Sequence, residues 1–251
     1  MTRDPRLGLS EMPTFQNYKT RPMKLLLFDI DGTILKTHGL GRRLIEEVLA
    51  RLCGRPISAE HVSFSGKTDP QIMQEILLRN GLSSTEAAAL APEAIAAYVA
   101  VAHHAIAPDH VEVLPGVRTL IERLADQEAV QLALLTGNHQ ITAYLKLEAA
   151  GLATHFPFGA FGSDHADRAE LPAVAVQRAY AHTGHTFTGK DVVIIGDSEN
   201  DVRCGRGIGA FAVAVCTGFT DRPTLAAQAP DLLLDDLSDP DLFLHHVMNH
   251  T

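Results

Sequence analysis

Short apolar runs alternate with helical patterns along most of the chain. The apolar runs are typical of buried strands and cover residues 24–28, 130–135, 158–161, 192–195, 211–215 and 232–234. Apolar residues at three- and four-residue spacing predict helices over residues 117–125, 140–150, 171–183 and 242–248 and from about residue 199. Such alternation is typical of a parallel sheet with right-handed crossovers and helices on both faces. We therefore predict an α/β fold with a doubly wound, Rossmann-like parallel sheet.

One block of the chain, residues 39–110, carries helical patterns without a strand. Glycine and proline stop or start its three predicted helices, which cover about 40–52, 69–80 and 84–106, with Pro92 as an alternative start of the third. A run of helices between strand-bearing segments is typical of a separate small domain. We expect residues 1–22 to be an N-terminal leader, residues 23–37 and 111–251 to form the α/β core, and residues 38–110 to form an inserted helical domain.

The first predicted strand ends in two carboxylates, Asp29 and Asp31, which Gly32 and Thr33 follow. Residues two apart on an extended chain point to the same side, and open α/β sheets bind ligands at the carboxyl ends of their strands. Two close and partly buried like charges are costly unless they share a cation or a proton. The pair therefore indicates a site, although Asp-Gly is also a common turn.

Composition narrows the range of partners. The formal net charge is −9, so a nucleic-acid backbone or an anionic membrane is not expected as the main partner. The three cysteines, Cys53, Cys204 and Cys216, form no CxxC pair, which is typical of a reducing compartment. No apolar run approaches the ~20 residues of a membrane span, and the first residues lack the apolar segment of a signal peptide. We expect a cytoplasmic protein without membrane or nucleic-acid partners.

Further polar clusters follow later strands, and strand ends of a doubly wound sheet converge on one edge. They are Thr136-Gly137-Asn138, the segment 163–168 with Arg168, and the acidic segment 197–201. Mg²⁺ prefers oxygen ligands, one carboxylate can act as a nucleophile, and another can exchange protons. Hydroxyls, backbone amides and a guanidinium can hold phosphoryl oxygens. The set therefore fits phosphoryl transfer.

These motifs, in this order, resemble the haloacid dehalogenase (HAD) superfamily, and most closely its phosphatases with a helical cap, the phosphoglycolate phosphatase-like group. The resemblance covers the chain from about residue 24 to the C-terminus. It implies Asp29 as nucleophile and Asp31 as general acid and base. It also implies Mg²⁺ bound by Asp29, the backbone carbonyl of Asp31 and Asp197, with Asp201 supporting these ligands from behind. Thr136 and Gly137, with Asn138 beside them, would contact the phosphoryl group.

Two departures from the family pattern concern charged residues. The third motif usually supplies a lysine, and Arg168 is the best-placed cation here. Lys190 competes for that role, but it precedes a predicted strand and so belongs at the wrong end of the sheet. Lys36 stands where an acidic residue commonly follows the first motif.

The helical block contains a loop, residues 65–69, that the resemblance places facing the active site. Lys67 would then touch the leaving group of the substrate. Thr68 or Asp69 before Pro70 is also explained by helix capping alone. Capping does not account for Gly66 and Lys67, so we expect Lys67 to bind substrate.

Three functions remain open from the sequence. The first is a Mg²⁺-dependent phosphomonoester hydrolase that acts on a small phosphorylated metabolite through an aspartyl-phosphate. A β-phosphoglucomutase-like phosphomutase shares that fold and intermediate. A non-catalytic, receiver-like phosphorylated switch shares an acidic pocket, but receivers are shorter and lack an inserted helical domain. Asp31 favours hydrolysis of a phosphate ester, because dehalogenase relatives lack an acid at this position.

Overall fold

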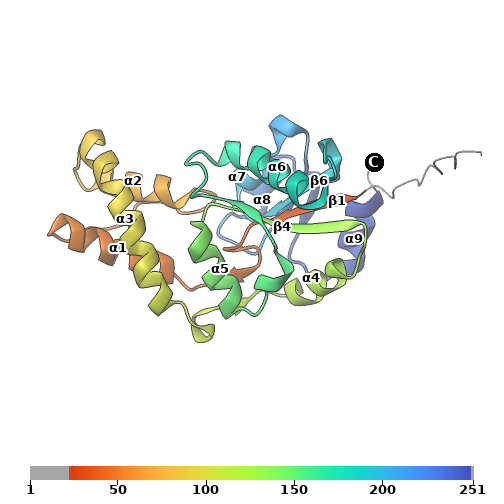
Figure 1. The fold of residues 1–251 in the computed structure, drawn as a ribbon, viewed down its shortest axis with the longest axis horizontal. Coiled ribbons are helices and arrows are strands. Elements are labelled where there is room, and N and C mark those ends of the chain that lie inside the picture. Colours follow the sequence, from red (N-terminus) through yellow and green to blue (C-terminus); the bar gives the residue numbers. More distant parts are fainter. Residues whose placement is uncertain (1–22, 250–251) are drawn as a thin grey trace, which may run out of the picture.

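The computed structural model describes residues 23–249, so the expected leader over residues 1–22 lies outside the described residues. Six parallel strands form the central sheet in the order β5-β4-β1-β6-β7-β8 (Figure 1). Their bounds are β1 Lys24–Phe28, β4 Val130–Thr136, β5 Gly159–Phe161, β6 Val192–Gly196, β7 Phe211–Val215 and β8 Leu232–Leu234. The predicted doubly wound α/β fold is confirmed.

Helices cover both faces of the sheet, as the alternation of side chains along β1 requires. Leu26 and Phe28 pack among residues of α4, α5 and α9, whereas Leu25 and Leu27 pack among residues of α6 and α7. All four side chains are fully buried, as is expected of a central parallel strand. The core helices are α4 Val117–Ala125, α5 Gln140–Ala149, α6 Leu171–Thr183, α7 Glu199–Cys204, α8 Arg222–Ala227 and α9 Pro240–Asn249.

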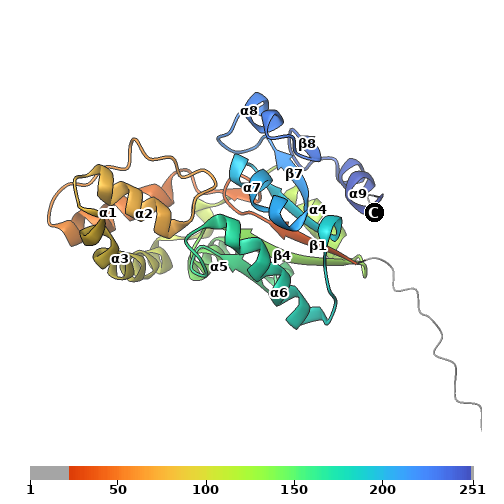
Figure 2. The same ribbon diagram turned by 90° about the horizontal axis from the view of Figure 1, so that it is seen from above.

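The block without strands folds into three helices, α1 Leu40–Cys53, α2 Asp69–Arg79 and α3 Ser84–Ala105. They lie together at one end of the molecule and share an apolar cluster of their own (Figures 1 and 2). Of the two starts considered for the third helix, Ser84 is the observed one. Ser83 and Glu86 form a capping box there, and Pro92 lies inside the helix. By length and composition α3 could also span a membrane, but here it packs against α1, α2 and α5.

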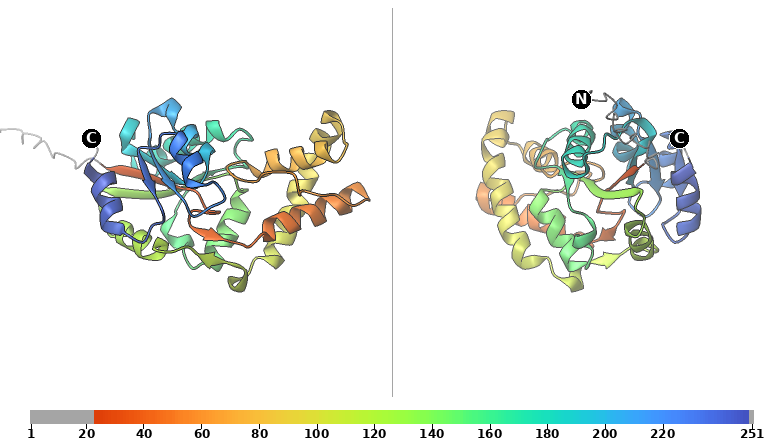
Figure 3. Two further views of the ribbon diagram at one scale, coloured as in Figure 1. Left: turned by 180° about the vertical axis from the view of Figure 1, so that it is seen from behind. Right: turned by 45° about the vertical axis from the view of Figure 1, so that its right-hand side comes forward.

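A short antiparallel pair, which the sequence patterns did not predict, lies between the core and the three helices. Strand β2 (Leu35–Lys36) pairs with β3 (Glu112–Val113), and Figure 3 shows the pair beside the lower end of the helical part. The pair joins the two segments of chain that run between the core and the helices. Our proposed boundaries, residues 38 and 110, fall just beyond it, and we refer to residues 38–110 as the cap.

Candidate active site

The first motif forms a tight loop at the carboxyl end of β1. The carbonyl of Ile30 accepts hydrogen bonds from the N–H groups of Thr33, Ile34 and Leu35. Asp29 itself donates its N–H to the Ile195 carbonyl at the end of β6. The side chain of Asp29 is 9% exposed, whereas that of Asp31 is 41% exposed. The chain therefore buries one carboxylate of the pair and presents the other to the cavity.

Three buried carboxylates meet beside this loop. One oxygen from each of Asp29, Asp197 and Asp201 lies within 4.8 Å of the other two. The Thr33 hydroxyl donates to Asp197 at 3.4 Å. A Cβ on Gly218 would overlap the Asp197 carboxylate, so the loop after β7 approaches that group closely. The expected metal ligands Asp29 and Asp197 are thus together, with Asp201 behind them.

Arg168 is the cation of this cluster. Its Nη2 lies 3.3 Å from Asp29 Oδ1, pairs with Asp201, and donates to the Leu135 carbonyl at 3.2 Å. Among the described residues, its Nε is the buried side-chain polar atom without a hydrogen-bond partner. Asp201 is held further by Ser198, whose N–H and hydroxyl donate to Oδ2 at 2.9 and 2.5 Å. One guanidinium therefore contacts two carboxylates and retains a free donor.

Burial and mutual repulsion perturb these carboxyl groups. Burial raises the pKa of Asp29 to about 6, although the Arg168 guanidinium opposes that change. Burial, together with the charges of Asp201 and Asp29, raises the pKa of Asp197 well above its usual range. Desolvation lowers the pKa of Arg168, but the negative charges of Asp201 and Asp29 raise it by more, so the net shift is upward. The cluster is therefore short of positive charge, which is the condition that a divalent cation relieves.

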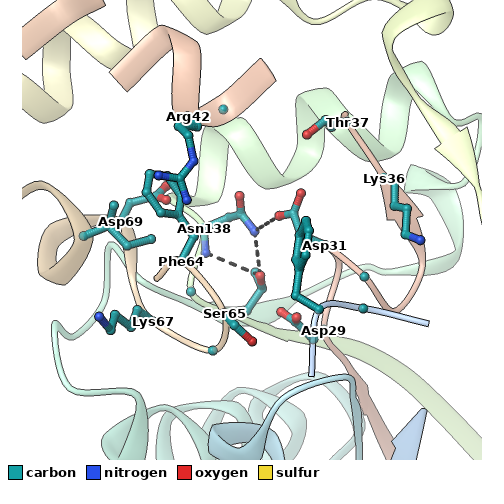
Figure 4. Close-up of a pocket in the computed structure, with 18 of the residues that line it drawn as sticks. Asp29, Asp31, Lys36, Thr37, Arg42, Phe64, Ser65, Lys67, Asp69 and Asn138 are labelled. Atoms are coloured by element: carbon teal, nitrogen blue, oxygen red, sulfur yellow. Dashed lines mark hydrogen bonds between the residues drawn. The ribbon is translucent and has the colours of Figure 1, made fainter. Parts of the chain in front are cut away.

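The second motif contacts both carboxylates of the first. The Thr136 hydroxyl hydrogen-bonds Asp29 and accepts the Asn138 amide at 2.8 Å. Asn138 Nδ2 also donates to Asp31 Oδ2 at 2.7 Å, as Figure 4 shows. Gly137 lies beside them, but its carbonyl accepts the Asp69 N–H at 2.8 Å. All three residues predicted from this motif therefore belong to the site, and Asn138 contacts Asp31 directly.

Lys146 is a site residue that the sequence patterns did not reveal. Its Nζ lies 2.6 Å from Asp31 Oδ2 and 2.6 Å from Asn138 Oδ1. It comes from α5, on the buried face that also carries Thr142 and Leu147. The one available signal was a lysine in register with the apolar residues of that helix. Such a residue is usually a partly buried stem with a solvated head.

The loop over residues 65–69 lies on the motif loops of the core. The Asn200 amide donates to the Gly66 carbonyl at 2.9 Å, and the Thr68 hydroxyl donates to the Ala166 carbonyl at 2.6 Å. Asp69 accepts the N–H of His139 at 2.7 Å. Thr68 also caps α2 through a capping box with Gln71, so the loop serves both capping and docking.

Lys67 is not directed at the carboxylates. It lines the cavity, but its Nζ pairs with Glu75 in the second turn of α2, and Figure 4 shows its side chain pointing away from Asp29 and Asp31. Lys190 is farther still. It pairs with Asp231 at 2.6 Å and donates to the Ala210 carbonyl, on the edge where β6 and β7 begin. Arg168 is therefore the cation that lies beside Asp29.

A cavity of about 470 Å³ extends from the two carboxylates to the cap. Its far wall includes Phe64 and Arg42, whose guanidinium stacks over the Phe64 ring at 4.2 Å. Arg42 donates to the carbonyls of Ala59 and Val62. Within residues 23–249, neither Arg42 nor Lys36, at the mouth, pairs with a carboxylate. Among the described residues, this part of the cavity wall therefore carries two cationic side chains that have no carboxylate partner.

Comparison with known proteins identifies the family. The model of the haloacid dehalogenase-like hydrolases matches residues 23–209. The chain belongs to this family. Its relatives include phosphoglycolate phosphatase 1 of Pseudomonas aeruginosa, which is 26% identical over 226 residues that cover 88% of this chain and 80% of the relative. The resemblance inferred from the four motifs, and with it the expectation of an enzyme, is confirmed.

Solved structures share the architecture at low sequence identity. A β-phosphoglucomutase from Clostridium difficile superposes with a TM-score of 0.69 at 17% identity, covering 90% of this chain and 97% of its own. A predicted phosphatase from Clostridium acetobutylicum superposes with a TM-score of 0.68 at 18% identity, covering 89% and 99%. At such identities the likeness concerns the fold alone, and it agrees with the α/β fold described above.

Proposed function

We propose that this hydrolase is a Mg²⁺-dependent phosphomonoester phosphatase that acts on a small phosphorylated metabolite through an aspartyl-phosphate on Asp29. The observation that carries the proposal is the division of labour between the two motif carboxylates. Asp29 is buried against Arg168 at 3.3 Å, and Asp31 lies on the same loop with its carboxylate open to the cavity. A nucleophile and a proton donor are needed at these two places for transfer and hydrolysis of a phosphoryl group.

The reaction divides into two displacements at phosphorus. An Asp29 oxygen attacks, the bond to the leaving oxygen breaks, and Asp31 gives its proton to that oxygen. Asp31 then takes a proton from water as the water attacks the phosphoryl group, which releases phosphate and restores the Asp29 carboxylate. Thr136, Gly137 and Arg168 stand where donors can hold the phosphoryl oxygens during both steps.

The residues present fit a divalent cation. Asp29, Asp197 and the Asp31 backbone carbonyl would hold it, while Asp201 is already committed to Arg168 and Ser198. Oxygen-only ligands of this kind suit Mg²⁺, which keeps several waters and binds substrate phosphate. When bound, the ion supplies the positive charge that the carboxylate cluster lacks and neutralises charge on the transferring group.

The cavity bears on the substrate class. Its volume of about 470 Å³ falls within the range of small-molecule sites, and a protein substrate would not fit beneath the docked loop. Lys36 and Arg42 favour a substrate whose leaving group carries its own negative charge, such as phosphoglycolate or a sugar bisphosphate. We place the protein in the cytoplasm and expect no nucleic-acid or membrane partner.

A phosphomutase remains the alternative, because solved neighbours with that name share the fold. The two activities differ in the fate of the phosphoryl group, which a mutase returns to the sugar. The receiver-like switch is dropped, because the chain belongs to a family of hydrolases.

The deciding experiment is a screen of phosphorylated metabolites for release of inorganic phosphate, with Mg²⁺ and with a chelator. The wild-type protein should release phosphate when Mg²⁺ is present and should not release it when the chelator has removed the ion. Asp29→Asn should keep the fold and lose the activity, because an amide is not a nucleophile of this kind. Isomerisation without phosphate release would favour the mutase, and wild-type turnover by Asp29→Asn would remove the nucleophile assignment.

A further inference from the structure

A lysine outside the four motifs contacts the acid/base carboxylate. The side chain of Lys146 is 5% exposed and lies in the last turn of α5. Its Nζ reaches Asp31 Oδ2 and Asn138 Oδ1, each at 2.6 Å. Lysines are almost never buried to this degree unless they are paired, since desolvation of the ammonium group is costly. Its two hydrogen-bond partners both belong to the candidate active site, and the Asp69 carboxylate also interacts with its charge.

Two donors converge on one oxygen of Asp31. Lys146 Nζ and Asn138 Nδ2 both bind Oδ2, at 2.6 and 2.7 Å. Asn138 is in turn fixed by the Thr136 hydroxyl at 2.8 Å. This arrangement leaves Oδ1 as the oxygen that can exchange a proton with the substrate, and it determines where that oxygen lies.

A purely structural role for Lys146 would use different partners. A basic residue in the last turn of a helix commonly binds the free carbonyls of that turn. Lys146 instead binds a carboxylate and an amide from two other segments, the loops after β1 and β4. Arg168 pairs with the other motif carboxylate, Asp29. Each of the two carboxylates therefore has its own buried cation.

We propose that Lys146 is a positioning residue of the reaction: it holds Asp31 by Oδ2 so that Oδ1 meets the oxygen of the leaving group. The proposal rests on the phosphatase function proposed above. A displacement of about 1 Å of a reacting group can cost about 10²-fold in rate. If Lys146 is removed, we expect the rate to fall only for the step in which Asp31 gives its proton to the leaving oxygen.

The test compares two leaving groups in Lys146→Met, which keeps the stem and removes the ammonium group. An alkyl phosphate expels an alkoxide that needs a proton from Asp31, whereas p-nitrophenyl phosphate expels a phenolate that needs little help. We expect kcat/KM to fall about 10²-fold for the alkyl phosphate and far less for the aryl phosphate. Inhibition by inorganic phosphate, which probes the phosphoryl pocket, should be unchanged.

Controls separate positioning from folding. Lys190→Met removes a lysine that pairs with Asp231 at the opposite edge of the sheet and should leave both rates unchanged. Lys146→Gln keeps a hydrogen-bond donor and should fall between wild type and Lys146→Met. Equal losses on the two substrates, no loss on either, or failure of both Lys146 variants to fold would each overturn the proposal.

A crystal structure of Lys146→Met gives a readout that does not depend on turnover. The Asp31 carboxylate should leave the position that it occupies here, and an unmoved carboxylate would contradict the proposal. If the wild-type protein hydrolyses neither the alkyl nor the aryl phosphate, the proposed function is wrong. The crystal structure of Lys146→Met still decides whether Lys146 positions Asp31.

Discussion

At the scale of single residues, the site pairs each motif carboxylate with a cation from a different element. Arg168, just before α6, lies 3.3 Å from Asp29, and Lys146, on α5, lies 2.6 Å from Asp31. The buried pair suits a nucleophile that must be shielded from water. The more exposed pair suits a group that exchanges protons with the substrate and then with water.

Arg168→Ala tests the cation assignment. The variant should lower kcat for phosphate release about 10²- to 10³-fold, the usual cost of removing one donor to developing charge. Lys190→Ala should remain near wild type, because its partner, Asp231, lies at the other edge of the sheet. Arg168→Lys should recover part of the rate, because it restores a charge beside Asp29. Initial rates decide, and a larger loss in Lys190→Ala would move the third-motif role to Lys190.

The residues that were predictable from sequence are those at strand ends. Asp29, Thr136 and Asp197 directly follow or end buried strands, so the period of the strand and the parallel sheet together place them. Lys146 was not predictable, because its helix pattern identifies a face but not the partner 115 residues away. The pairing of Lys67 with Glu75 was equally hidden, because it depends on which rotamer the loop allows.

At the scale of elements, one contact that joins the cap to the core beside the site is the docking of the start of α2 on the loop after β4. Asp69, the first residue of α2, donates its N–H to the Gly137 carbonyl, and its carboxylate accepts the N–H of His139. Burial raises the pKa of Asp69 to about 6, although Lys146 and the His139 N–H oppose that change. Ionised Asp69 is therefore a source of instability in the docked arrangement.

Asp69→Asn should show this instability. A raised folded-state pKa means that the folded state binds the proton more tightly than the unfolded state, whose pKa is near 3.8. The stabilisation is complete below pH 3.8 and is lost as the pH rises through 6. The neutral amide avoids this loss, so Asp69→Asn should exceed wild type by up to about 3 kcal/mol at pH 7 and match it near pH 4.

Denaturant unfolding across this pH range measures the difference between the two proteins. Asp109→Asn changes an exposed aspartate of the same cap and is the control. An Asp69→Asn protein that is less stable than wild type at pH 7 would show that the ionised carboxylate stabilises docking.

At the scale of the whole molecule, the sheet order brings distant segments to one edge. β1 lies between β4 and β6, so the loops after these three strands are neighbours at the same edge of the sheet. The alternation of helix and strand predicted a doubly wound parallel sheet but not the order of its strands, and the uninterrupted helical block predicted the inserted helices. The β2–β3 pair was not predictable, because two-residue strands carry no period.

The central claim is that Asp29 carries the phosphoryl group during turnover. Its most direct measurement is mass spectrometry of peptides from the enzyme, acid-quenched during turnover of its best substrate. Phosphate should be found on the peptide that contains Asp29 in wild type and be absent from Asp29→Asn. Turnover without a phosphorylated Asp29 peptide, or with phosphate trapped on another residue, would contradict the account.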